Sequence, residues 1–233
     1  MSNKLLDLIE PFVRKALPAF KFAQLAYDIA DDLTSDQVYL RKEPSIKPFL
    51  EEVLPIATFA KIWERPGRHL TVEYFGPNHP YDATVSLCGS EVDEGDIESV
   101  YYVEVTSAMF EREHLEREAL ARDGSVFHDP NIHHVGSRHK GDRRIVSHAT
   151  AEDGDTSLKE LQAWVISAIE AKNSHTYRKP SILIVRSEPS RPLALSEWSS
   201  LIAAASSVAR ASQFDAVVVV DWYSSIVYWL KSL

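Results

Sequence analysis

The chain has 233 residues, of which 45% are hydrophobic, and its formal net charge is −9. This length and composition suit one α/β domain with additions better than two independent domains. The negative charge excludes a whole-molecule field that attracts nucleic acid, so any such binding must come from a local basic patch.

The chain has a single cysteine, Cys88, and contains no apolar run long enough to span a bilayer. One cysteine excludes an internal disulfide framework and agrees with a reducing compartment. The absence of a long apolar run predicts a protein without a membrane span. The expected location is therefore the cytoplasm.

The first part of the chain carries apolar residues at helical spacing, punctuated or kinked by Pro11 and Pro18. We expect residues 1–43 to form an N-terminal helical extension of a domain that occupies residues 44–233.

A second helix is predicted over residues 46–63, with Pro55 bending it. Its adjacent acids, Glu51 and Glu52, lie on the exposed or site-facing side. Adjacent acids on a helix usually form a solvated face, so a functional role for either one competes with that simpler interpretation.

Three strands are predicted next, over residues 70–75, 81–87 and 100–106, joined by a turn-rich segment and then by an acidic connection. They follow one another as an antiparallel meander. Side chains alternate between the two faces of a strand. Asp82 therefore shares a face with the polar residues of its strand, and Glu104 does the same.

The rest of the chain alternates predicted helices and strands. The helices are expected over residues 110–121, from the capping-box pattern at 157–160 onward, and over 196–211; the strands over 181–185, 216–220 and 226–230; and a long polar loop over 125–156. This order predicts an α/β fold with a mixed central sheet flanked by helices.

If the second and third strands of the meander are neighbours, Asp82 and Glu104 converge on one polar spot. Paired carboxylates on rigid strands are suitable ligands for Mg²⁺ or Mn²⁺, which prefer oxygen donors. The competing interpretation is a sheet with one solvated face, where polar residues alternate because water lies there.

A helix, a three-strand meander carrying Asp82 and then Glu104, a further helix and a buried strand follow one another over residues 46–186. This arrangement resembles the PD-(D/E)XK nuclease superfamily, and it implies a restriction-endonuclease-like fold. The resemblance implies that Asp82 and Glu104 bind Mg²⁺ and that Glu52 or Glu51 is an assisting helical acid.

The sequence departs from that family in two places. Tyr81 separates Pro80 from Asp82, and Thr106 occupies the position of the family's lysine. A threonine cannot supply the cation that stabilises negative charge in the transition state. A basic residue from a neighbouring helix would have to replace it, and the candidates are Arg112, Arg117 and Lys159.

The predicted polar loop holds a local excess of positive charge, formed by Arg138, Lys140, Arg143 and Arg144. Placed beside the acids, these groups would hold phosphates, although an ordinary solvated loop is the alternative. The histidines of the loop fit no compact zinc spacing, which favours a polar loop over a transition-metal cluster.

The expected function is a Mg²⁺-dependent nuclease whose catalytic set is Asp82, Glu104, Thr106, Glu52 and Arg117. The alternative is a catalytically inactive nuclease-like domain that binds nucleic acid or a protein partner through the basic loop. The aromatic end of the chain is expected to pack in the core; an exposed aromatic edge there would instead pair two subunits as a homodimer.

Overall fold

The computed structural model describes the chain except for short segments. The described residues are 8–41, 43–76, 78–109, 113–126, 129, 131–137, 141, 143–149, 154–188, 192–221 and 226–233. Within them, no helix is both long and apolar enough to cross a membrane.

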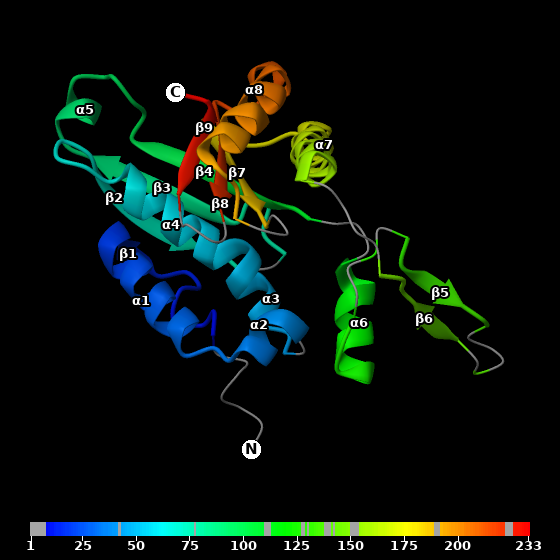
Figure 1. The fold of residues 1–233 in the computed structure, drawn as a ribbon. Helices are drawn as coiled ribbons and strands as arrows, with labels where there is room; N and C mark the ends of the chain where they lie inside the picture. The colour runs from blue at the N-terminus through cyan, green and yellow to red at the C-terminus, as the bar shows by residue number, and fades with distance from the viewer. Residues whose placement is uncertain are drawn as a thin grey trace.

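A seven-stranded mixed sheet forms the centre of the molecule (Figure 1). Of the strand pairs in this sheet that the structure describes, β4–β7 and β7–β8 are parallel and the others antiparallel. The predicted meander is confirmed, because β2, β3 and β4 pair antiparallel in chain order. In spatial order the strands are β1 (Ala16–Pro18), β2 (His69–Tyr74), β3 (Ala83–Cys88), β4 (Val100–Ala108), β7 (Ser181–Ser187), β8 (Ala216–Asp221) and β9 (Val227–Lys231).

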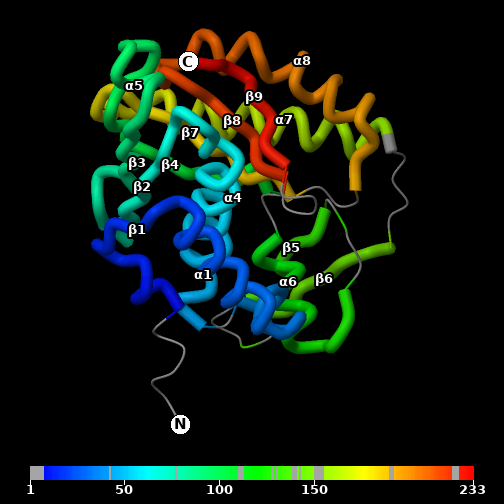
Figure 2. The backbone as a smooth tube through the Cα atoms, turned by 90° about the vertical axis from the view of Figure 1, so that its left-hand side faces the viewer, coloured from blue at the N-terminus to red at the C-terminus, as the bar shows by residue number. Residues whose placement is uncertain are grey.

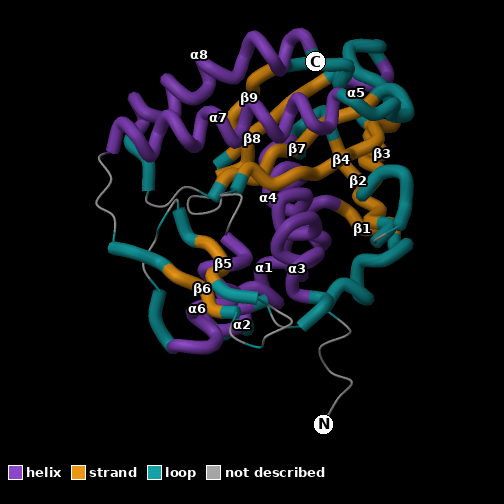
Figure 3. Tube along the Cα trace, turned by 90° about the vertical axis from the view of Figure 1, so that its right-hand side faces the viewer, coloured by secondary structure: helices purple, strands orange, loops and turns teal. Residues whose placement is uncertain are grey.

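Helices cover both faces of the sheet (Figures 1 and 2). One face packs against α1 (Ala19–Asp31) and α4 (Leu54–Trp63). The other face packs against α7 (Gly154–Asn173) and α8 (Leu195–Ala211), which run side by side in Figure 3. The alternation of buried side chains along the central strands divides the interior into two apolar layers.

The helix predicted over residues 46–63 is present as three continuous segments. They are α3 (Ile46–Pro48), a π-helical turn η1 (Phe49–Val53) and α4. The backbone N–H of Leu54 donates to the carbonyl of Phe49, five residues back. Proline removes a helical hydrogen bond, and Pro55 stands at the start of α4, next to this irregular turn. The irregularity lies where the sequence predicted a bend.

The N-terminal segment is more than a helical extension. β1 pairs with β2 as an edge strand of the sheet, and α1 begins directly after Pro18. Phe12 and Phe22 are fully buried in the main apolar layer. A second short helix, α2 (Ser35–Leu40), follows α1. Pro18 cannot continue a helix from its N-terminal side, so the apolar spacing before it belongs to a turn and a strand instead.

The segment predicted as a polar loop over residues 125–156 contains regular structure. β5 (His133–Val135) pairs antiparallel with β6 (Arg144–Val146), and α7 already begins at Gly154. Together with α6 (Glu113–Asp123), this hairpin lies to one side of the main sheet in Figure 1. Its small apolar cluster includes Ile132 and Ile145. A strand of three residues is too short for the alternation of polar and apolar side chains to be recognised in the sequence.

Buried Asp129 joins the two ends of the β5–β6 hairpin by hydrogen bonds. Its carboxylate accepts hydrogen bonds from the backbone N–H groups of Asn131, at 2.8 Å, and His148, at 2.7 Å. These bonds lower the pKa of Asp129, with the bond from His148 contributing most.

The connection between Gly89 and the start of β4 contains one short helix, α5 (Ser90–Asp93).

Candidate functional site

Asp82 and Glu104 lie close together at the start of β3. The antiparallel ladder of β3 and β4 ends with the pair Ala83 and Val103, and Asp82 directly precedes Ala83. The backbone N–H of Asp82 donates to the carbonyl of Val103, at 3.0 Å. The two carboxylates are near enough that the charge of Glu104 adds to the larger effect of burial in raising the pKa of Asp82. The structure therefore brings together the two acids that the strand patterns singled out.

The carboxylate of Asp82 also completes the backbone pairing of β4. Its Oδ2 accepts a hydrogen bond from the backbone N–H of Val105, at 2.7 Å. Because β3 begins only at Ala83, this side chain takes the place of the missing strand partner. The bond fixes the orientation of the carboxylate beside Glu104.

Lys172, in the last turn of α7, is a cation that contacts Glu104 of this acid pair. Its Nζ lies 2.5 Å from Oε1 of Glu104, and the Glu104 side chain is only 12% exposed. α7 packs over β4 and carries the lysine across that face of the sheet. A charge-assisted bond of this kind holds the ammonium group beside both carboxylates.

Glu52 approaches the same spot from η1. Its Oε2 accepts a hydrogen bond of 2.5 Å from the hydroxyl of Tyr74, a fully buried residue of β2. The charge of Glu52 acts on Asp82, and the charge of Glu104 acts on Glu52. The neighbouring acid, Glu51, instead forms an ion pair with Arg41.

Crowding of negative charge changes the protonation of this site. Burial, followed by the charges of Glu104 and Glu52, raises the pKa of Asp82 to about 7. The bond from Val105 and the charge of Lys172 act in the opposite direction but are outweighed. Burial likewise raises the pKa of Glu52. A site where carboxylates repel one another favours either protons or an added cation.

The two carboxylates suit a hard divalent cation, although they are few ligands for one. In the part of the chain that the structure describes, no three His, Cys, Asp or Glu side chains are grouped to hold a metal ion. Mg²⁺ is commonly held by one or two carboxylates, with water and substrate phosphate completing its shell. Among the described residues, Oδ1 of Asp82 and Oε2 of Glu104 have no hydrogen-bond partner. One oxygen of each carboxylate is thus left to bind a cation.

The structure places the other predicted catalytic residues around or away from this site. Thr106 follows Glu104 by two positions on the same face of β4. Arg117 forms an ion pair with Glu113 on α6. Lys159 is exposed near the start of α7, and Arg112 lies outside the described residues. Among the helix cations of the described residues, Lys172 contacts Glu104, and it was not one of the predicted candidates.

The predicted basic loop is described only in part. Arg143 and Arg144 are exposed on the β5–β6 hairpin, whereas Arg138 and Lys140 lie outside the described residues. No described contact joins the two exposed arginines to the acid pair. Their predicted role in binding phosphate remains a prediction.

Comparisons with known proteins add no family. A scan against protein-family models, a search of curated proteins and a search of solved structures each found no match.

Proposed function

We propose that this protein is a Mg²⁺-dependent nuclease, a divergent PD-(D/E)XK enzyme with a restriction-endonuclease-like fold. The observation that carries the proposal is the contact between Lys172 and Glu104, whose charges both act on Asp82. Two carboxylates and one cation are the components that phosphodiester hydrolysis needs at the reacting phosphate. Lys172 supplies from a helix the charge that the sequence lacks at Thr106.

Each residue has a defined task in this proposal. Asp82, fixed by Val105, and Glu104 would hold Mg²⁺, which when bound provides a nucleophilic water and neutralises phosphate charge. Lys172 stabilises the additional negative charge that develops on the phosphate oxygens. Glu52 lies close enough to add to the negative potential that attracts the cation.

Metal-dependent cleavage tests the proposal directly. Purified protein would be incubated with single- and double-stranded DNA and RNA in the presence of Mg²⁺ or Mn²⁺. We expect cleavage by the wild type and its loss, by about 100-fold or more, in Glu104→Gln and Lys172→Met. Lys159→Met is the matched control, since this lysine is on the same helix but exposed, and it should cleave normally.

Metal titration by calorimetry separates binding from chemistry. Glu104→Gln should lose Mg²⁺ affinity, whereas Lys159→Met should keep it. Thermal unfolding of each variant checks that the fold persists. Nucleic-acid binding without cleavage under all conditions would contradict the nuclease and favour the catalytically inactive alternative, in which the domain only binds nucleic acid or a protein.

A further inference from the structure

A row of aromatic rings leads to the acid pair. The rings of Phe75 and His79 are stacked, with centroids 4.3 Å apart. Tyr81 meets His79 edge-on at 4.3 Å, and Tyr102 continues the row 4.9 Å from Tyr81. Each successive ring is within contact distance of the next.

The row ends at the proposed catalytic residues. Tyr81 directly precedes Asp82, and Tyr102 lies two positions before Glu104 on the same face of β4. The guanidinium of Arg178, an exposed residue, lies over the ring of Tyr102 at 5.0 Å. An arginine in this position adds a planar cation to the aromatic surface.

The segment that carries Arg178 borders the acids as well. Burial, together with the charges of Glu104 and Asp82, raises the pKa of Tyr177 to about 12. The end of α7 and the residues after it supply Lys172, Tyr177 and Arg178 to one side of the site.

The four rings are not part of the apolar core. Phe75, His79, Tyr81 and Tyr102 are each only partly buried. By contrast, the paired core rings of Phe12 and Phe22 are 0% exposed. Rings that served packing alone would be covered in the same way. Partly exposed rings beside an arginine instead offer flat surfaces to a planar, negatively charged ligand.

We propose that this row binds the unpaired bases of a single-stranded nucleic acid, with Arg178 contacting its backbone phosphates. This inference rests on the proposed nuclease function and names its substrate class. Stacking needs exposed base faces, which a duplex keeps within its own stack. Arg178 places one positive charge beside the row, where a backbone phosphate can contact it, in a chain that is negative as a whole.

Binding without cleavage tests the inference. Fluorescence anisotropy would follow a labelled oligothymidylate, and separately its duplex with oligodeoxyadenylate, in EDTA. We expect the wild type to prefer the single strand. Tyr102→Leu and Arg178→Gln should each weaken that binding by about tenfold. Unfolding curves verify the fold of Tyr102→Leu, and Arg178→Gln changes only an exposed side chain.

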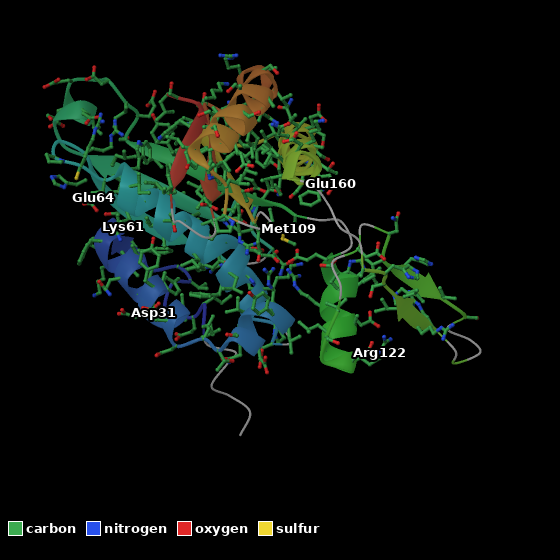
Figure 4. The ribbon with its side chains drawn as sticks, viewed as in Figure 1. Asp31, Lys61, Glu64, Met109, Arg122 and Glu160 are labelled. Atoms are coloured by element: carbon green, nitrogen blue, oxygen red, sulfur yellow. The ribbon has the colours of Figure 1, made fainter. Side chains whose placement is uncertain are left out.

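The matched control variants change residues on other helices. Tyr39→Leu removes a tyrosine that is 60% exposed on α2. Arg122→Gln removes an arginine on α6, labelled in Figure 4, whose side chain is 44% exposed. Both should bind the single strand as the wild type does. Equal affinity for the duplex, no binding by the wild type, or unchanged binding by Tyr102→Leu and Arg178→Gln would overturn the inference.

Cleavage assays on the same oligonucleotides, with Mg²⁺ added, keep the two ideas apart. Binding of the single strand that depends on Tyr102 but is never followed by cleavage contradicts the nuclease alone. Equal cleavage of both oligonucleotides, unchanged in Tyr102→Leu, contradicts the single-strand inference alone.

Discussion

At the scale of single residues, the position of Lys172 determines what the site can do. It lies 68 residues after Glu104 in the chain yet contacts it in space. The motif of the resembling family places its lysine at a fixed distance from the acid along one strand. A cation that comes from a helix has no fixed distance from that acid in the sequence. The acids could be found from sequence because strand alternation places them, whereas the lysine depends on how α7 packs over β4.

A charge swap tests whether the location of the ammonium group matters more than the element that carries it. Thr106 shares the face of Glu104 on β4. In the nuclease proposed above, adding Thr106→Lys to the inactive Lys172→Met variant should recover about tenfold or more in cleavage rate, because the cation returns to the acids. Thr71→Lys in the same background, on β2, is the control. Recovery by both, or by neither, would contradict this explanation.

The raised pKa of Asp82, caused first by burial and then by the charges of Glu104 and Glu52, predicts a pH-dependent stability of the metal-free protein. The pKa of Asp82 is about 7 in the folded chain against an ordinary value of 3.8. Because the folded state holds this proton more tightly, its stabilising contribution is complete below about pH 3.8 and is lost as the pH rises through about 7.

Asp82→Asn should remove this dependence, since an amide does not titrate in this pH range. Its amide oxygen can still accept the bond from Val105. Between about pH 5 and about pH 8 the wild type in EDTA should lose about 2 kcal/mol more unfolding free energy than the variant. Urea titrations at each pH measure it. Asp31→Asn, on an exposed acid of α1 (Figure 4), should behave as the wild type, and a parallel loss in Asp82→Asn would refute the assignment.

At the scale of elements, a chain of ion pairs joins the end of β7 to η1. Arg186 is fully buried and contacts Glu188 at 2.6 Å. Glu188 also pairs with Arg41, which in turn binds Glu51. Arg186 further approaches the sulfur of Met109, placed just after β4 in Figure 4. These contacts fix η1, and with it Glu52, relative to the strands of the site.

Removing the buried arginine should be costly. Arg186→Met leaves Glu188 with one fewer cation in a desolvated position, and we expect a loss of about 3 kcal/mol in unfolding free energy. Arg65→Met is the comparison, because the side chain of Arg65 is 59% exposed in its pair with Glu91 and should cost less than about 1 kcal/mol. Equal losses in denaturant titrations would argue against a structural role for the network.

Element prediction succeeded where the pattern was long. The strands of the meander and the helix over 46–63 were found because alternation and helical spacing persist over several residues. The start of α7 was misplaced, since the capping-box pattern at Ser157 lies inside a helix that begins at Gly154. β1 and the β5–β6 pair were missed because three residues carry too little pattern.

At the scale of the whole molecule, the N-terminal segment is part of the main core. Phe12 lies between Phe22, at 4.9 Å, and Phe49, at 6.3 Å. These rings link the segment before β1, helix α1 and η1 in one apolar layer. Residues 8–41 therefore contribute to the same folding unit as the central sheet, a connection that depends on contacts between residues far apart in the sequence.

This connection predicts unequal effects for two neighbouring phenylalanines. Phe22→Ala should lower the unfolding free energy by about 3 to 5 kcal/mol, because it leaves a cavity in the core. Phe20→Ala should change it by less than about 0.5 kcal/mol, because Phe20 is 69% exposed. Chemical denaturation measures both. A small effect of Phe22→Ala would indicate that α1 is only loosely attached.

β1, the strand at one edge of the sheet, also limits how the protein can associate with other chains. β1 is three residues long and ends in Pro18, which has no amide hydrogen to offer another chain. Natural sheets often protect their borders with short strands and proline. Pro18, the residue directly before α1, therefore opposes the pairing of another chain with this edge of the sheet.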